Sequence, residues 1–246
     1  MNWHDRFLQQ ASWTQFTRHY LCAKANISKS KRILEVGCGT GVILNELDSA
    51  GYHKTFGIDI DRRHLDLAQK NLPLNLLVEG NAFHLPLKDK VFDITYCHYL
   101  LLWLTNPSQA ITEMKRVTCS GGYVLILAEP DYGGRIDYPE NLVHLANLQT
   151  KSLISQGADP YIGRKIRGLL SCAGLIEIET GVMGGEWNHI PDRSSRDLEW
   201  QVIRNDLNVE IDQSQLGAYQ ELDDLAWKNQ SRILYVPTFY SIGRVP

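Results

Sequence analysis

Three glycines at alternate positions, Gly37, Gly39 and Gly41, follow directly on a short apolar run that contains Glu35. Each glycine costs backbone entropy, so three together indicate backbone conformations closed to other residues, or the close approach of another molecule. Asp59 ends the next apolar run, 18 positions past Gly41, where a carboxylate can accept hydrogen bonds from ribose hydroxyls. The spacing therefore favours a nucleoside-containing ligand that lies against bare backbone amides.

Glu35 distinguishes between the ligands that such a turn can bind. A pyrophosphate is negative and is repelled by a carboxylate two residues before the first glycine. Dinucleotide-binding turns also carry GxGxxG, whereas this chain has GxGxG. An acid at this position instead suits a ligand that carries positive charge.

The elements that position these residues alternate between strands and helices. A helix is expected over 3–25, where aromatic and apolar residues recur at spacings of three and four. Another begins at Asn106, a good N-cap followed by Pro107. Strands are expected at 32–36, 54–59, 75–79, 92–97 and 122–128. The alternation predicts an α/β fold with a doubly wound, mostly parallel sheet.

The pattern changes after residue 130. Helices are expected at 139–155, 161–173 and 192–229, and the alternation over 176–182 predicts a half-exposed strand at a sheet edge. The chain ends in a predicted last strand or hairpin, interrupted by Pro237. There is no room for the further βα units of a closed (β/α)8 barrel.

Composition narrows the class of protein. The chain has 246 residues, 43% of them hydrophobic, which is enough for one large domain, and its net charge of -3 disfavours a nucleic-acid partner. Five widely spaced cysteines without a CxxC pair argue against disulfides and thiolate metal sites, and a reducing cytoplasm is expected. No signal peptide, membrane span or metal site is predicted.

Five segments carry a family resemblance: ILEVGCGTG, GIDID, GNAFHLP, FDITYCHYLLLWL and MKRVTCSGGYVLILAEP, in this order over about residues 31–130. They resemble the successive motifs of class I S-adenosylmethionine-dependent methyltransferases, most closely the small-molecule branch that includes ubiquinone and menaquinone biosynthesis enzymes. The resemblance implies a seven-stranded Rossmann-like sheet and a single methyltransferase domain over 1–246. It also implies a helical cap at 1–30, with helical insertions at 131–158 and 184–230 near the acceptor.

The resemblance implies a cofactor site at the carboxyl ends of the strands. Residues of the glycine turn would surround the methionine and sugar, an acid would bind the ribose, and the segments after the second and third strands would contact the adenine. The N-terminal helix would close over the methionine end. The residues implied are Glu35, Gly37, Cys38, Gly39, Asp59, Ile60, Asn81, Ala82, His98, Trp13 and Arg18.

Several of these positions leave alternatives open. The family more often has aspartate where Asn81 stands; the asparagine carbonyl can accept from the adenine amino group, but Asn81 can equally cap its loop. The guanidinium of Arg18 suits a forked pair of hydrogen bonds to the carboxylate of the cofactor. Alternatively, Trp13 is a packing residue and Arg18 is solvated. Cys38 and Cys97 also fit as small packing residues.

His98 follows the fourth strand and is the candidate general base. It can equally fix a loop or contact the methionine portion of the cofactor. Contacts to the acceptor are expected from two segments, 128–139 and 156–165, which are rich in charged and aromatic residues. The alternative is that Asp and Arg in these segments pair with each other. The candidate acceptor residues are Asp131, Tyr132, Arg135, Tyr161 and Arg164.

Three functions remain open at this stage. The first is methyl transfer from S-adenosylmethionine, with S-adenosylhomocysteine as product, to an oxygen, nitrogen or carbon of a small molecule. The second is a nicotinamide-dependent oxidoreductase, which Glu35 disfavours. The third is a non-catalytic cofactor-binding or interaction protein. The insertion at 184–230 fits either a lid over the acceptor or the face of a homodimer.

Overall fold

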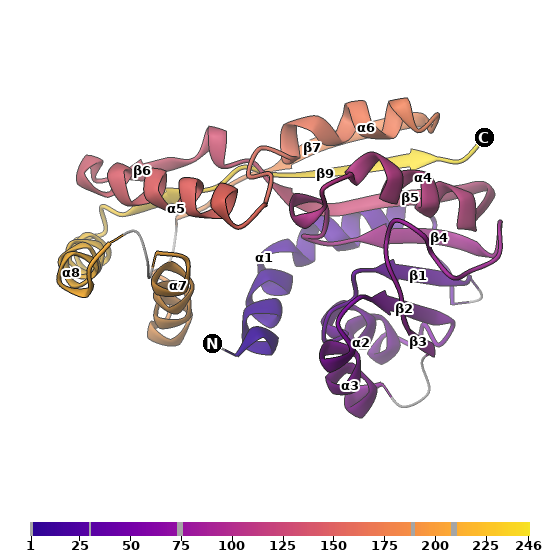
Figure 1. Ribbon diagram of the computed structural model, residues 1–246, viewed down its shortest axis with the longest axis horizontal. Coiled ribbons are helices and arrows are strands. Elements are labelled where there is room, and N and C mark those ends of the chain that lie inside the picture. The colour runs from indigo at the N-terminus through magenta and orange to yellow at the C-terminus, as the bar shows by residue number, and fades with distance from the viewer. Residues whose placement is uncertain (1, 30, 73–75, 188–189, 208–210) are drawn as a thin grey trace.

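The computed structural model describes residues 2–29, 31–72, 76–187, 190–207 and 211–246, and its centre is one large sheet flanked by helices (Figure 1). The predicted strands at 32–36, 54–59 and 92–97 are confirmed to within a residue, and that at 75–79 is confirmed apart from residue 75, which lies outside the described residues. The strand predicted at 122–128 is longer. The strands of this sheet are β1 (Ile33–Val36), β2 (Thr55–Asp59), β3 (Leu76–Glu79), β4 (Phe92–Cys97), β5 (Thr118–Pro130), β7 (Ile176–Met183) and β9 (Thr238–Arg244).

The order of the strands places a switch point in the middle of the sheet. Among the described residues the sheet has seven strands in the order β3-β2-β1-β4-β5-β9-β7, parallel through β5, with β9 antiparallel to both of its neighbours. The expected doubly wound, mostly parallel sheet is confirmed, and β7 lies at its edge. The direction of winding reverses between β1 and β4, and ligands bind beyond the carboxyl ends of the strands at such a switch point.

Helices cover both faces of the sheet. The predicted helix at 3–25 is α1 (Trp3–Lys24), which packs with α2 (Val42–Ser49) over one face. α3 (Arg62–Asn71) lies beside α2, while α4 (Pro107–Val117) and α6 (Ile166–Cys172) cover the other face. The predicted start of α4 is confirmed, because the side chain of Asn106 accepts the N–H of Gln109 at 3.3 Å.

The alternation of side chains along β1 directs the candidate acid. Ile33 packs against Leu21 of α1, whereas Leu34 and Val36 join the cluster on the α4 face. Successive strand residues point to opposite faces, so Glu35 points to the face covered by α1 and α2. The carboxylate is therefore buried on this face and does not lie in solvent.

A separate group of elements, which we call the accessory lobe, lies at the opposite end of the molecule from α2 and α3, with α1 between them (Figure 1). Its helices confirm the expected helical character of 139–155 and 192–229 for the residues described. The accessory lobe consists of β6 (Ile136–Tyr138), α5 (Val143–Ser155), α7 (Arg193–Asp206), α8 (Gln213–Lys228) and β8 (Ile233–Tyr235).

The end of the chain forms a last strand, β9, which is one of the two possibilities expected from the sequence. β8 and β9 do not form a terminal hairpin: β8 pairs with β6, while β9 pairs with β5 and β7. Pro237 lies between β8 and β9 and has no N–H to continue a ladder. The insertion at 131–158 contains the strand β6 as well as the helix α5.

Candidate functional site

The glycine turn after β1 has both a conformation and an environment that exclude side chains. Gly37, Gly39 and Gly41 have φ of 74°, 51° and 75°, which is the left-handed region. A Cβ on Gly37 would lie 2.7 Å from a methyl group of Leu100, and one on Gly39 would lie 2.9 Å from the ring of Phe7. The turn therefore presents bare backbone, with α1 lying over it.

Glu35 is an acid with no cation bonded to it among the described residues. It is 3% exposed, and its carboxylate accepts the phenol O–H of Tyr96 at 3.1 Å. Burial raises the pKa of Glu35 to about 8, while the bond from Tyr96 and the charge of Arg18 lower it. A ligand cation placed near this carboxylate would stabilise its ionised form.

Asp59 ties the end of β2 to the glycine turn. Its carboxylate accepts the N–H of Gly39 at 2.7 Å and the N–H of Asp61 at 2.9 Å. Ile60 follows with 69% of its surface exposed, which leaves an apolar side chain beside the carboxylate. The structure thus brings the acid and the apolar platform, both expected from the sequence, to one edge of the sheet.

The segment after β3 has mainly internal contacts. The side-chain oxygen of Asn81 accepts the N–H of Phe83 at 2.9 Å, which is the loop-capping alternative weighed for this residue. Ala82 packs against the core under α4, and Cys38 packs with Leu44 in the cluster between α2 and α3. An adenine contact from Asn81 would therefore use its amide group or follow a rearrangement of this loop.

Arg18 lies in α1 with internal partners. It is 3% exposed and donates to the Ala11 carbonyl and to Glu46 of α2, while its Nε has no hydrogen-bond partner among the described residues. The fork expected to hold a ligand carboxylate thus already binds an acid of the protein. Trp13 is 51% exposed and stacks on Arg6 at 4.9 Å, which is a contact within α1.

His98 is held against α1. Its Nε2 lies 2.9 Å from the hydroxyl of Thr14, and its ring meets that of Tyr99 edge-on at 4.7 Å. Burial lowers the pKa of His98 to about 3, with the charge of Arg18 adding to the effect. A histidine with this pKa is neutral at physiological pH and is a weak general base.

The charged residues expected to contact the acceptor are paired with each other. Arg164 donates to both carboxylate oxygens of Asp131, at 2.5 and 2.8 Å, and its guanidinium lies over the ring of Tyr161. Arg135 donates to Asp137 at 2.6 Å. The structure therefore shows the alternative in which Asp and Arg of these segments hold the loops together.

Tyr132 differs from the other residues of that group. Burial raises the pKa of its phenol, and the charges of Arg6 in α1 and Glu199 in α7 also act on it. The phenol is thus un-ionised and lies within range of charged groups from two elements. Its position keeps Tyr132 a candidate for an acceptor contact.

Sequence reasoning missed two residues of the site. Phe7 covers Gly39, and Glu129 is a completely buried acid at the end of β5. A charged residue inside an otherwise apolar strand signals a buried, hydrogen-bonded group, and the run YVLILAE carries this signal as clearly as ILEV does. The contact from Phe7 depends on the docking of α1 and has no comparable local signal.

Neither a metal site nor a membrane-spanning helix is present among the described residues. No group of three or more His, Cys, Asp or Glu side chains in them is arranged to hold a metal ion. None of the described helices is both long and apolar enough to cross a membrane.

Part of the chain is similar to known proteins. Residues 34–126 match the family described as "Methyltransferase domain". An uncharacterized methyltransferase of Schizosaccharomyces pombe is 32% identical over 160 residues, covering 58% of this chain and 55% of that protein. Demethylmenaquinone methyltransferase of Lactiplantibacillus plantarum is 30% identical, covering 46% and 52% respectively. The chain thus spans about half the length of these relatives.

The fold has counterparts among solved structures. A S-adenosylmethionine-dependent methyltransferase of Thermotoga maritima, described as a possible histamine N-methyltransferase, aligns over 100% of this chain and 95% of its own, with a TM-score of 0.60 and 17% identity. Residues 34–126, which match the methyltransferase domain, include Glu35, the glycine turn and Asp59. This match favours methyl transfer over a nicotinamide-dependent oxidoreductase. Residues 34–126 are thus similar to methyltransferase domains, and the fold of the chain is that of a solved S-adenosylmethionine-dependent methyltransferase.

Proposed function

We propose that this chain transfers a methyl group from S-adenosylmethionine to a small-molecule acceptor by in-line displacement. One observation carries the proposal: the buried carboxylate of Glu35, two residues before a left-handed glycine turn, has no bonded cation among the described residues. Such a place fits a ligand that carries a positive charge, whereas the N–H groups of Gly37, Cys38 and Gly39 already donate to Ile58 and Asp59 of the protein. The ammonium and sulfonium of S-adenosylmethionine supply that charge.

The residues that would hold the cofactor lie at the carboxyl ends of β1 and β2. Gly37 and Gly39 offer backbone beside the methionine and ribose, Asp59 would accept from ribose hydroxyls, and Ile60 would pack on the adenine. The bound cofactor supplies a methyl group on a positively charged sulfur. The protein then has mainly to hold the acceptor atom, the methyl carbon and the sulfur in line.

His98 does not act as a general base in this proposal. Its imidazole is neutral, and its Nε2 already lies 2.9 Å from the Thr14 hydroxyl. We assign His98 to the wall of the site, where it keeps the turn after β4 attached to α1. We therefore expect an acceptor whose reacting atom has a free lone pair and does not have to be deprotonated by the enzyme. The relative from L. plantarum, by its name a demethylmenaquinone methyltransferase, supports a small-molecule acceptor.

We further propose that α7 and α8 act as a lid within one chain and not as the face of a homodimer. Arg6 of α1 donates to Glu199 of α7 at 2.6 Å, and Gln9 donates to the carbonyl of Ser195 at 2.9 Å. These contacts fasten the accessory lobe to the helix that covers the glycine turn. A particle with the mass of one chain in light scattering supports this assignment, and a two-chain mass contradicts it.

The cofactor is tested by isothermal titration with S-adenosylmethionine, S-adenosylhomocysteine and NADH. Binding of the first two and not of NADH is expected. Asp59→Asn should weaken this binding about tenfold or more, because a charged hydrogen-bond acceptor is lost. Asp61→Asn is the matched control: Asp61 lies two residues away and accepts the N–H of Arg63, but it makes no bond to the glycine turn.

Catalysis needs a second measurement. A panel of small molecules with phenol, amine, carboxylate and activated-carbon acceptors is incubated with S-adenosylmethionine, and release of S-adenosylhomocysteine is followed. Turnover with one class identifies the acceptor. Tight cofactor binding without turnover on any class would favour the non-catalytic alternative.

A further inference from the structure

A buried carboxylate that this mechanism does not use lies at the end of β5. Glu129 is completely buried, and it accepts three consecutive backbone N–H groups: Leu100 at 2.9 Å, Leu101 at 2.7 Å and Leu102 at 3.2 Å. These residues belong to the turn after β4, which includes the short helix η1 (Leu101–Trp103). Because β4 and β5 are parallel neighbours, the acid lies at the same sheet edge as the cofactor site.

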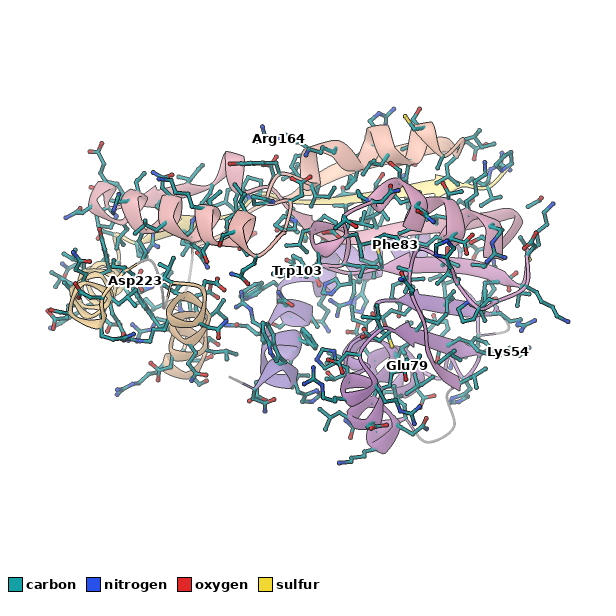
Figure 2. All side chains as sticks on the ribbon, in the orientation of Figure 1. Lys54, Glu79, Phe83, Trp103, Arg164 and Asp223 are labelled. Atoms are coloured by element: carbon teal, nitrogen blue, oxygen red, sulfur yellow. The ribbon has the colours of Figure 1, made fainter. Side chains whose placement is uncertain are left out.

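The turn held by Glu129 forms part of the wall of that site. The side chain of Leu100 occupies the space in which a Cβ of Gly37 would lie, at 2.7 Å, so the turn packs directly against the glycine turn. His98 stands at its start and contacts α1. Trp103 stands at its end, 46% exposed, between the sheet and the accessory lobe (Figure 2).

The backbone of this turn needs support from outside. Tyr99 has a φ of 51°, a left-handed conformation that a residue with a side chain rarely adopts unless its surroundings impose it. Its N–H donates to the carbonyl of Ala128 at 2.9 Å. Four successive amides, from Tyr99 to Leu102, are thus held by two adjacent residues of β5. A single carboxylate holds three of the four.

The charge of Glu129 matters to this arrangement. An ionised carboxylate accepts through both oxygens, whereas a protonated oxygen would point its own hydrogen at a backbone N–H. Bonds from backbone N–H groups favour the ionised form of a carboxylate. Burial acts in the opposite direction and raises the pKa of Glu129 to about 8, so the carboxylate should hold the turn most firmly above that pH.

We propose that Glu129 is a positioning residue for methyl transfer. Its carboxylate holds residues 98–103 in the arrangement that lets Leu100 support the glycine turn and places His98 and Trp103 beside the bound molecules. Glu129 acts through the backbone of the turn and touches neither cofactor nor acceptor. This inference rests on the proposed function, since it assigns the purpose of the turn to cofactor binding.

The test compares two variants of the full chain. Glu129→Gln keeps the size of the side chain but turns an amide NH2 toward the backbone N–H groups. Thr95→Val is the matched control, because it removes a buried hydrogen bond between Thr95 and Thr118, at 2.8 Å, on the same pair of strands. The control leaves the turn untouched and reports the effect of a general loss of stability.

Two measurements are made on each variant: hydrogen–deuterium exchange of the peptide that covers residues 98–103, and the Kd of S-adenosylhomocysteine. In Glu129→Gln the amides of Leu100, Leu101 and Leu102 should exchange about tenfold faster or more. The Kd should rise about tenfold or more. Thr95→Val should stay within about twofold of the wild type in both measurements.

Each other outcome overturns the inference. Unchanged exchange shows that Glu129 does not hold the turn, and unchanged affinity shows that the turn does not shape the cofactor site. Equal effects in Thr95→Val assign the loss to general destabilisation. If Glu129→Gln does not fold, Glu129→Asp replaces it, since its shorter side chain cannot reach all three amides. A wild-type chain that binds neither cofactor form refutes the proposed function instead, while the exchange data still report on the turn.

Discussion

Acids lie beside the glycine turn and in the segment 131–138 that follows β5, and the structure uses them in opposite ways. Beside the turn, Glu35 is buried with a phenol as partner and without a bonded cation among the described residues. In the loop, Asp131 is bonded to Arg164 and Asp137 to Arg135. A buried acid whose partners are cations or several backbone N–H groups maintains architecture, as Asp131 and Glu129 do, whereas Glu35, which accepts from a single phenol, is suited to a charged ligand. The partner of an acid, more than its place in a loop, separates the two roles.

The largest effect is expected from breaking the ion network of the accessory lobe. Arg232 is 4% exposed and donates to Asp223 of α8 at 2.6 Å and to Asp137 of β6 at 2.8 Å. Figure 2 shows Asp223 within this lobe. Arg232→Met leaves the buried carboxylate of Asp223 without its cation and that of Asp137 with Arg135 alone, which costs about 3–5 kcal/mol of folding free energy. Chemical denaturation measures this loss.

The same variant tests the contrast between the two regions. If the network of Arg232 is purely architectural, the folded fraction of Arg232→Met should bind S-adenosylhomocysteine within about twofold of the wild type. Loss of binding at a temperature where the variant is folded would show that the accessory lobe takes part in forming the cofactor site.

The second effect concerns the bare backbone of the turn. Gly37→Ala adds a Cβ at 2.7 Å from Leu100 and strains a φ of 74°, so the Kd of S-adenosylhomocysteine should rise about tenfold or more. Gly121→Ala is the control: its φ is 80°, and nothing lies within 4 Å of its added Cβ. Both variants should lose similar stability through strain, so a change in affinity shared by both would contradict the role of the turn.

A smaller effect is expected from the charge of Glu35. Its pKa is about 8 in the folded protein against an ordinary value of 4.5, so the folded state keeps a proton that the unfolded chain has lost. The contribution of Glu35 to stability therefore falls as pH rises from about 4.5 to about 8. A ligand cation lowers this pKa, and binding below pH 8 must release a proton.

The affinity for S-adenosylmethionine should consequently increase from pH 6 to pH 7.5, by up to about tenfold per pH unit. Titration calorimetry in buffers of different ionisation enthalpy measures the proton released. Glu35→Gln should flatten the pH dependence, and comparison with this variant separates Glu35 from Glu129, whose pKa is also about 8. A wild-type affinity independent of pH over this range would mean that Glu35 does not face the charge.

The parts of the fold that the sequence predicted are those determined by local patterns. Strands β1, β2 and β4 follow from short apolar runs, and the start of α4 follows from Asn106 and Pro107, because capping is decided within one turn of helix. The pairing of β6 with β8 was not predicted. These strands lie about a hundred residues apart, and their pairing depends on how the accessory lobe folds around Arg232.

In the candidate site, too, local features could be predicted from the sequence and long-range contacts could not. The left-handed glycines and the acid before them could be predicted, because their types and spacing have a local physical meaning. The partners of charged side chains could not. Arg18 binds Glu46 and Arg164 binds Asp131, in each case across a long stretch of chain. Sequence shows that a side chain can form an ion pair, but the tertiary fold selects its partner.

The smallest effect concerns the link between the two regions. Arg6 of α1 is buried and Glu199 of α7 is partly exposed, with 2.6 Å between their charged groups. In a double-mutant cycle with Arg6→Met and Glu199→Gln, we expect a coupling energy of about 1 kcal/mol in the free energy of unfolding, because one partner of the pair remains in contact with water. A coupling close to zero would mean that the accessory lobe and α1 do not stabilise each other through this pair, and the lid would then be free to move without breaking it. A measurable coupling instead requires that any opening of the lid first separate Arg6 from Glu199, so that salt, which screens this pair, should speed the exchange of the cofactor.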